Sequence, residues 1–378
     1  MVKLSDVCDV RDGTHDTPKY VEYGYPLVTS KNIKDGQLDL SVVNFITEED
    51  YNKINERSKV DVGDIIMPMI GTIGNPYLIE GGSDFAIKNV ALIKCDNIKV
   101  INRFIWYFLQ SDAFERYVDR KNKGGTQKFL SLGDIRNIEL PEISIDVQKD
   151  IIEILSYVDS IVAKRKQQLQ KLNELVKARF VEMFGDVPVN NYVALKDLCL
   201  IITDGTHQPP KFTTEGIPFL FVSNIVSNKI TYDTTKFIAE ETYSELMKRT
   251  PIEIGDVLLS TVGSYGHPAV VENDVKFCFQ RHIAYLKPNK NIMNSWYLQN
   301  ALLFREVQYQ IDEKVKGIAQ KTLNLSEIKT LRIPLPSLEQ QNLFADFVQQ
   351  IDKSKLHVQK SLGKLEILKK SLMQKYFG

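Results

Sequence analysis

One short motif whose residue types could carry chemistry occurs twice in this chain of 378 residues. Asp-Gly-Thr-His begins at Asp12 and again at Asp204, and each copy runs on to a Pro-Lys pair. A histidine close to an aspartate suggests acid–base catalysis or metal binding. The same residues suit a tight turn, in which Asp and Gly allow the backbone geometry, Thr caps and His hydrogen-bonds locally. We favour the turn, because nearby titratable positions differ between the copies: His282 replaces Asn89.

A basic segment is the best candidate for nucleic-acid binding. Residues Arg116–Lys128 read RYVDRKNKGGTQK, with five basic residues, one acidic residue and a Gly-Gly hinge. The second half of the chain offers Lys314–Lys321, KVKGIAQK. Lysine and arginine suit phosphates, and a Gln-Lys pair can read base edges in a groove. A solvated helix end is the alternative, but the return of Gly, Gln and Lys in the second copy favours DNA binding.

Other polar positions recur at matched places. Lys-Asn at 31–32 and Ser-Asn at 223–224 follow predicted strands. The Gly-rich loops are GTIG (71–74) and GSYG (263–266). Such loops either bind phosphate through backbone N–H groups or form tight hairpins. Asn89 and His282 enter a strand and could equally be hydrogen-bonding residues at the edge of the core. The predicted DNA contacts are Lys31, Asn32, Thr72, Asn89, Arg120, Lys121, Lys123, Gln127, Lys128, Ser223, Asn224, Ser264, His282, Lys314, Lys316, Gln320 and Lys321.

These matched positions belong to a duplication of the whole chain. Asp12 and Asp204 are separated by 204 − 12 = 192 residues, and Pro26 and Pro218 by the same number. Late in each half the separation is 193, as for Gln127 and Gln320. A separation that drifts by one residue over such a length indicates a true internal repeat. Each half therefore contains one copy of every candidate site.

Each half should combine a mixed α and β domain with one long helix. Short β-branched and aromatic runs are separated by Gly, Pro and Asn turns, and a helix is expected near Asn102–Arg120. Apolar residues at three-and-four spacing then predict a long helix from about Gln148, repeated from about Gln341. The predicted parts are domain 1 at 1–147, a helix at 148–185, a linker at 186–192, domain 2 at 193–340 and a helix at 341–378.

The two long helices should pair with each other. Neither is expected to be stable alone in water with such an apolar stripe, so an antiparallel coiled coil within one chain is the economical arrangement. The predicted fold class is α+β, with two similar domains and a pseudo-twofold internal repeat. Roughly 35 residues at ~1.5 Å each would give a rod of about 50 Å. Two similar domains on such a rod suit a target with approximate twofold symmetry, such as duplex DNA.

Composition and charge narrow the class of protein. Lys+Arg and Asp+Glu both number 48, so any nucleic-acid surface must be a local patch. Residues 1–147 carry 18 basic and 23 acidic residues, a net charge of 18 − 23 = −5. The four cysteines are far apart and form no Cys-x-x-Cys pair, which favours reduced, structural thiols in the cytoplasm. Neither a signal peptide nor an apolar run long enough for a membrane span is expected.

Taken together, the duplicated motifs resemble a known family. The repeated Asp-Gly-Thr-His openings, the Gln-Lys-x-Leu segments at 127–130 and 320–323, the Gln-rich helix starts and the paired helices that end in Phe-Gly resemble the specificity subunits of type I restriction–modification systems. The resemblance covers essentially the whole chain. Each motif is modest alone, whereas their duplicated order is highly specific.

The resemblance implies a subunit that recognises DNA and catalyses nothing. It implies two target-recognition domains, each reading one half of a bipartite double-stranded DNA site, and helices that set the spacing between the half-sites. It also implies two methyltransferase (modification) subunits docked on the helices, joined by restriction/translocase subunits in the full complex. No cofactor and no metal are expected for this chain itself. The DNA contacts named above rest on physical reasoning, because recognition loops differ between family members.

Two other classes of function fit parts of the sequence. A tandem adaptor that binds only proteins would use the long helices and would lack salt-dependent DNA binding. A methyltransferase or nuclease acting alone is less well supported: Asn75-Pro76-Tyr77 resembles the signature of amino-methyltransferases but lacks a proline, and no S-adenosylmethionine-binding glycine motif precedes it. Binding of that cofactor, or metal-dependent cleavage by the purified chain, would distinguish the enzyme.

Overall fold

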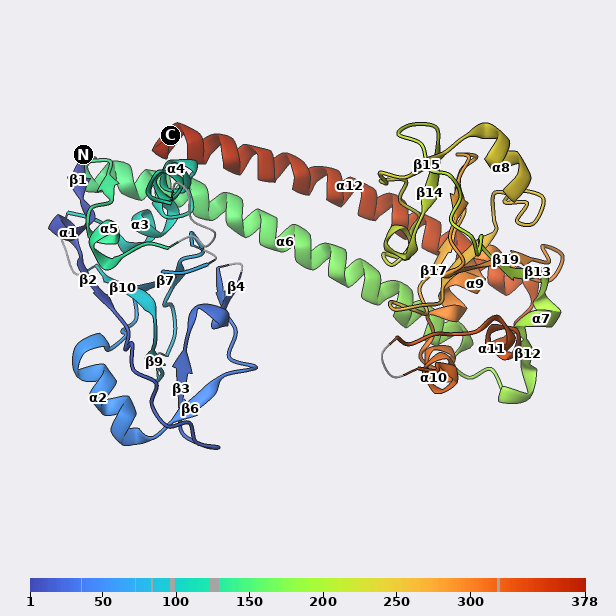
Figure 1. The fold of residues 1–378 in the computed structure, drawn as a ribbon, viewed down its shortest axis with the longest axis horizontal. Coiled ribbons are helices and arrows are strands. Elements are labelled where there is room, and N and C mark those ends of the chain that lie inside the picture. The colour runs from blue at the N-terminus through green and yellow to red at the C-terminus, as the bar shows by residue number, and fades with distance from the viewer. Residues whose placement is uncertain (35, 72, 83, 96–98, 123–128, 318–319) are drawn as a thin grey trace. The chain divides into compact units, whose positions relative to one another are not determined.

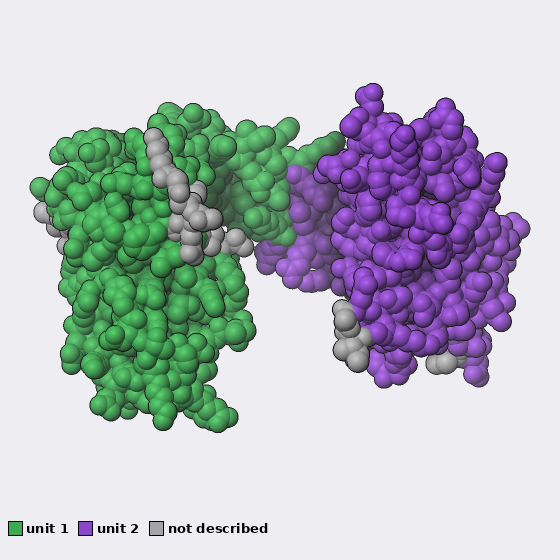
Figure 2. Space-filling view, in the orientation of Figure 1, with its two compact units in different colours: residues 1–166, 360–378 green, residues 167–359 purple. Residues whose placement is uncertain are grey.

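The chain forms two compact units that each combine helices and strands. The computed structural model describes residues 1–378 except 35, 72, 83, 96–98, 123–128 and 318–319. Unit 1 comprises residues 1–166 and 360–378, and unit 2 comprises residues 167–359, coloured green and purple in Figure 2. Both units contain antiparallel sheets and short helices (Figure 1), which confirms the predicted α+β class with two similar domains.

Unit 1 is built around a four-stranded antiparallel sheet. Its strand order is β2 (Asp9–Asp12), β10 (Val90–Lys94), β7 (Ile65–Pro68) and β8 (Tyr77–Leu78). A second sheet has the order β6 (Asn44–Ile46), β3 (Tyr25–Val28) and β9 (Ala86–Ile87), with β3 and β9 parallel. Two further strand pairs are β1 (Val2–Lys3) with β11 (Glu139–Leu140), and β4 (Ile33–Lys34) with β5 (Gln37–Leu38).

Short helices surround these sheets in unit 1. They are α1 (Leu4–Val7), the 3₁₀ helix η1 (Ser30–Asn32), α2 (Glu48–Ser58), α3 (Asn102–Phe108), α4 (Asp112–Lys121) and α5 (Leu132–Arg136). The sequence predicted one helix near Asn102–Arg120, and the structure has two. Helix α3 ends at Phe108, and Ser111 is the N-cap of the next helix. Its hydroxyl accepts a hydrogen bond from Phe114 N at 3.3 Å, which favours a new helix start at this point.

Unit 2 repeats this arrangement. Its main sheet has the order β13 (Cys199–Asp204), β19 (Ile283–Pro288), β16 (Val257–Ser260) and β17 (Pro268–Val270), and its second sheet has the order β15 (Phe237–Ile238), β14 (Ile217–Leu220) and β18 (Cys278–Phe279). The strands β12 (Tyr192–Ala194) and β20 (Arg332–Pro334) form a pair. The short helices are η2 (Val189–Asn191), α7 (Leu195–Leu198), η3 (Val222–Asn224), α8 (Glu240–Leu246), α9 (Ser295–Leu302), α10 (Arg305–Lys314) and α11 (Leu325–Thr330).

The central strands β10 and β19 are buried on both faces. Along β10, Ala91 and Ile93 belong to one apolar cluster, whereas Val90 and Leu92 belong to another. This is the alternation of a strand whose successive side chains point to opposite faces. Strand β19 is divided between two clusters in the same way. Each unit therefore has a core on both sides of its main sheet, which fixes the strand ends that carry the candidate motifs.

The two long helices are α6 (Ile145–Phe184) and α12 (Leu338–Phe377), of 40 residues each. Residues 145–166 of α6 and 360–377 of α12 belong to unit 1, and the remaining parts belong to unit 2. In unit 1, Leu155 of α6 and Phe377 of α12 share one core, and the Phe377 ring lies 5.2 Å from that of Phe104. In unit 2, Phe180 of α6 lies 5.4 Å from Phe344 of α12. The start of one helix thus meets the end of the other within each unit, as an antiparallel pair requires.

The separation between equivalent residues of the two halves changes from 192 to 193 at one turn of the structure. Lys88 and Gln280 make equivalent backbone hydrogen bonds, and 280 − 88 = 192. Val90 and Ile283 are also equivalent hydrogen-bond partners, and 283 − 90 = 193. Between these positions unit 1 has one residue, Asn89, with a left-handed backbone (φ 54°), and unit 2 has two. The extra residue therefore lies in the turn that contacts the Asp-Gly-Thr-His motif.

No helix in the described part of the chain is long and apolar enough to cross a membrane.

Candidate nucleic-acid interface

The repeated Asp-Gly-Thr-His motif lies where β2 and β13 end. Gly13 passes so close to a neighbouring strand that a Cβ atom would lie 2.3 Å from Ile87 O. At Gly205 a Cβ atom would lie 2.2 Å from Phe279 O. Only glycine fits such an approach. The glycine of the motif is therefore explained by backbone packing, in agreement with the turn interpretation.

The aspartate of the motif contacts a histidine and an arginine. Asp12 is 6% exposed, and its Oδ2 atom lies 2.8 Å from Nε2 of His15. Its Oδ1 atom accepts a hydrogen bond from Arg57, which lies in the last turn of α2. The other ring nitrogen of His15, Nδ1, lies 2.8 Å from Oδ1 of Asn89. These contacts with Asn89 and Asp12 raise the pKa of His15 above its ordinary value.

Unit 2 repeats this cluster with one change. Asp204 lies 2.9 Å from Nε2 of His207 and also pairs with Arg249. The turn that contains Asn89 in unit 1 here holds Arg281 and His282. Nε of Arg281 lies 3.3 Å from Nε2 of His282, and burial together with the nearby Arg281 charge lowers the pKa of His282. The turn of the second copy therefore presents the cation Arg281 in the place where the turn of the first copy has Asn89.

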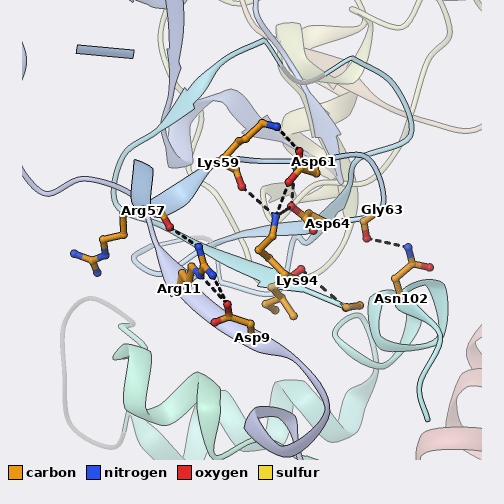
Figure 3. A network of polar contacts seen from close by, with 11 residues as sticks. Asp9, Arg11, Arg57, Lys59, Asp61, Gly63, Asp64, Lys94 and Asn102 are labelled. Carbon is orange, nitrogen blue, oxygen red and sulfur yellow. Dashed lines mark hydrogen bonds and ion pairs between the residues drawn. The ribbon is translucent and has the colours of Figure 1, made fainter. Parts of the chain in front are cut away.

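A polar network in unit 1 positions the arginine of the cluster (Figure 3). Arg11 of β2 pairs with Asp9 at 2.6 Å and donates to the backbone oxygen of Arg57 at 2.8 Å. The end of α2 is thus tied to the strand that carries Asp12. Nearby, Lys94 of β10 lies 2.5 Å from the buried Asp64, and burial of that carboxyl raises its pKa. These contacts connect β2 to the end of α2, and β10 to the residue that precedes β7.

The Gly-rich loop and the Gln-Lys segment meet in unit 2. Gly263 N donates to Lys321 O at 3.0 Å, and Leu323 N donates to Thr261 O at 2.8 Å. Nζ of Lys321 lies 6.0 Å from the ring centroid of Tyr265, within the range of a cation–π contact. Two segments that the sequence proposed separately therefore form one surface.

A polar cavity of about 270 Å³ lies beside this surface. It brings Asp204 of the repeated motif together with His282 and Gln320, two predicted DNA contacts. Arg281 and Asn324 also line it. Amides and cations that converge on an open cavity can donate to base edges and phosphates, and the amides can also accept from base edges.

In unit 1 the described residues beside the same two segments also meet. Leu130 N donates to Met69 O at 2.9 Å, the counterpart of the Leu323–Thr261 bond. Ile70 and Phe129 form an isolated β-bridge, and Asn122 Oδ1 accepts from Phe129 N at 2.6 Å. The predicted contacts Thr72, Lys123, Gln127 and Lys128 lie outside the described residues.

Several predicted contacts are exposed hydroxyls or cations that are exposed or half-buried. Lys121 pairs with Asp134 at 2.9 Å, and Lys314 and Lys316 pair with Glu327 at 3.8 and 2.9 Å. Surface ion pairs of this kind are weak, so these cations can exchange their partners for phosphates. The remaining exposed positions are Lys31 in η1, Arg120 in α4, Ser223 in η3 and Ser264 in the Gly-rich loop.

Two predicted contacts are buried. Asn32 and Asn224 are 5% and 4% exposed. The Asn32 amide accepts from Thr29 N at 3.0 Å and donates to two backbone carbonyls further along the loop. Asn224 has the equivalent bonds to Phe221 N and to the carbonyls of Thr231 and Asp233. Both amides are thus used within the chain to hold the adjacent loop.

Sequence reasoning missed the arginines that pair with the motif. Arg57 and Arg249 are separated by 249 − 57 = 192 residues, which is the repeat offset. A search for identical residues at the repeat offset would have identified both arginines. Neither lies in a recognisable motif. Arg281 and Asn324, which line the cavity of unit 2, were also missed because they flank the predicted residues without matching a repeated motif.

The chain is similar to specificity subunits of type I restriction–modification systems. The type I restriction enzyme EcoBI specificity subunit of Escherichia coli is 25% identical over 328 residues, which cover 77% of this chain and 68% of the relative. The MjaVIII specificity subunit of Methanocaldococcus jannaschii is 22% identical over 379 residues, covering 92% and 84%.

Solved structures give the same fold. The type I restriction–modification S subunit from M. genitalium matches with a TM-score of 0.56 and 15% identity, covering 100% of this chain and 95% of that one. A chain from a structure of complex assembly and conformational transition in a type I system matches with a TM-score of 0.58 and 18% identity, covering 100% and 96%. The family model described as the type I restriction modification DNA specificity domain matches residues 1–174 and 190–366. The chain therefore belongs to this family and contains its specificity domain twice, as the resemblance in the sequence implied.

Proposed function

We propose that this chain is the subunit that reads DNA for a type I restriction–modification complex, with each domain reading one half of a bipartite site. The observation that carries this proposal is the duplicated specificity domain, in which the same motif, Gly-rich loop and basic segment recur in both halves. As a specificity subunit, the chain recognises DNA and leaves catalysis to its partners.

The recognition domains would comprise residues 1–147 and 193–340, joined by the linker 186–192. The helical parts at 148–185 and 341–378 would set the spacing between the half-sites. Duplex DNA advances ~3.4 Å per base pair, so a fixed helical connection translates into a fixed number of base pairs. Helices of 40 residues each are long enough for this role.

We assign two kinds of DNA contact, phosphate contacts in both domains and base contacts in the second domain. The exposed cations Arg120, Lys121, Lys316 and Lys321 would bind phosphates, which positions the domain on the duplex. The cavity residues His282 and Gln320, with Arg281 and Asn324, would read base edges. For Asn32 and Asn224 we propose a supporting role, since their buried amides hold the loops that follow β3 and β14.

The partners in this proposal are double-stranded DNA, two methyltransferase subunits and the restriction/translocase subunits. We place the assembly in the cytoplasm, where chromosomal and incoming DNA are both accessible. The long helices would provide the docking platform, because their outer faces retain apolar side chains such as Tyr157 and Ile367, which are 68% and 72% exposed.

The test is a map of modified bases in cells that lack any other such system. Cells that express the methyltransferase with this chain should gain methylation at one bipartite motif, and the map would give both half-sites and their spacing. Cells that express the methyltransferase alone are the control. Methylation that is independent of this chain would refute its role in specificity and would favour the adaptor that binds only proteins.

A further inference from the structure

A buried glutamine lies near the start of each long helix. Gln148 in α6 is 2% exposed, and Gln341 in α12 is not exposed at all. Buried polar side chains normally have every hydrogen-bonding group satisfied, so the partners of these amides indicate what they do.

Each amide makes three hydrogen bonds to backbone groups of the domain that precedes its helix. Oε1 of Gln148 accepts from Ile101 N at 2.9 Å, and its Nε2 donates to Lys99 O at 3.0 Å and Ile143 O at 3.1 Å. Ile101 is the N-cap residue directly before α3. Ile143 lies between β11 and α6. One side chain thus connects a domain helix, the strand exit and the long helix.

The second copy makes the same three bonds. Oε1 of Gln341 accepts from Asn294 N at 2.9 Å, and its Nε2 donates to Ile292 O and Pro336 O, both at 3.0 Å. Each of these four residues lies 193 positions after its counterpart, as in 341 − 148 = 193. Three of the four positions hold different side chains in the two halves, and only the glutamine is identical. The geometry therefore depends on the glutamine and on backbone atoms.

The chemistry of the site requires a neutral amide. One backbone N–H and two carbonyls must be satisfied, and a primary amide offers one acceptor and two donors in a fixed plane. A carboxylate at this position would face two carbonyl oxygens, and an apolar side chain would remove all three of these hydrogen bonds. The three bonds also fix the direction in which the helix leaves the domain, because they join a side chain of the helix to backbone atoms of the domain.

We propose that Gln148 and Gln341 are positioning residues that hold each recognition domain at one angle on its long helix, so that the complex accepts only one spacer length. This inference rests on the proposed function. Adding one base pair between half-sites moves the second by ~3.4 Å and rotates it by about a tenth of a turn. Selection against such a small change needs a rigid junction, whereas base recognition within each half-site does not depend on it.

The experiment uses the chain in complex with its methyltransferase subunits and a panel of DNA duplexes. All duplexes carry the correct half-sites, with the natural spacer or with one base pair more or fewer, and one further duplex carries a scrambled half-site. The variants are Gln148→Met, Gln341→Met and the double variant. Gln340→Met is the matched control, because Gln340 is exposed and, among the described residues, its Oε1 accepts from Ser337 alone, through N and Oγ at 3.3 Å each.

The wild type and the control should bind the natural spacer strongly and discriminate against the other lengths. Each Met variant should reduce that discrimination by about tenfold, as expected for loss of buried hydrogen bonds. It should keep full discrimination against the scrambled half-site. The double variant should tolerate both altered spacers best.

Two outcomes would overturn the inference. One is a variant that assembles and keeps the wild-type ratio between spacers. The other is an equal loss of affinity for every duplex, which would mean that the glutamines only stabilise the fold. If the Met variants do not assemble, Gln148→Asn and Gln341→Asn, which retain a shortened amide, are measured in the same panel, and failure of these to assemble also counts against a positioning role. A wild-type complex without preference for any bipartite duplex would instead refute the proposed function.

Discussion

His15 bridges Asp12 and Asn89 through its two ring nitrogens, each at 2.8 Å from an oxygen atom. A neutral imidazole donates from only one nitrogen, so two acceptors together favour the imidazolium. The repeated motif of unit 1 therefore has a charged form that its own surroundings stabilise.

This arrangement predicts how the motif responds to pH. The pKa of His15 is raised by Asn89 first and by Asp12 second. Its contribution to stability should be fully present below the unfolded value of about 6.5 and lost as the pH rises through the higher folded pKa. NMR titration should show a pKa above the ordinary value, and Asn89→Ala should lower it. An unchanged titration curve in Asn89→Ala would contradict the bridge.

The glycine of the motif should not tolerate a side chain. In Gly13→Ala and Gly205→Ala the new Cβ would collide with a backbone carbonyl, so we expect a loss of about 1–3 kcal/mol in the free energy of unfolding. Gly81→Ala is the control, because a Cβ there meets nothing within 4 Å, and its effect should stay within ~0.5 kcal/mol. Equal stability of all three variants in denaturant titrations would show that Gly13 and Gly205 lie farther from the neighbouring carbonyls than these distances indicate.

Neighbouring residues in η3 should differ in importance for stability. Asn224→Ala removes a buried amide that holds backbone groups on both sides of a loop, and we expect it to cost about 1–3 kcal/mol. Ser223→Ala alters an exposed hydroxyl and should change stability by less than ~0.5 kcal/mol. Thermal unfolding of the two variants measures this difference. An Asn224→Ala variant as stable as the wild type would contradict the supporting role and favour a DNA contact for Asn224.

The basic segment of the first domain should contribute nonspecific affinity. Combined Lys121→Ala and Lys128→Ala substitutions should weaken binding to all sequences alike. Loss of two phosphate contacts should reduce the slope of log affinity against log salt by about 1.8. Binding isotherms at several salt concentrations measure this slope. Unchanged affinity and slope would identify the segment as the wrong surface.

The length of the long helices should set the spacing of the half-sites. Inserting four residues near Gln167 adds about one turn, roughly 6 Å. The methylated motif should then have a longer spacer and the same two half-sites. A changed base sequence with an unchanged spacer would refute this role of the helices.

The fold could be predicted largely because the sequence is duplicated. A pattern that occurs twice at the same separation is not expected by chance. Both long helices were predicted from the spacing of their apolar residues. The break at Ser111 was not predicted, because the apolar pattern continues across it and a local capping bond decides where the second helix begins.

The candidate site was harder to predict. Asn32 and Asn224 were expected to contact DNA, yet their amides are used inside the loops, and a sequence does not show to which side a polar side chain turns at a strand end. Arg57 was overlooked because its partner Asp12 lies 45 residues away in the sequence. Contacts of that kind depend on tertiary packing, which local patterns do not encode.

The division of the long helices between the units has a consequence for synthesis of the protein. Unit 1 requires residues 360–378, and Phe377 from this segment packs on Phe104 in its core. A ribosome reaches these residues only after all of unit 2 has been made. The first domain to emerge is therefore the last to be completed, and until then it exposes the apolar surface that α12 will cover. Truncation of this distant segment should accordingly damage the N-terminal domain.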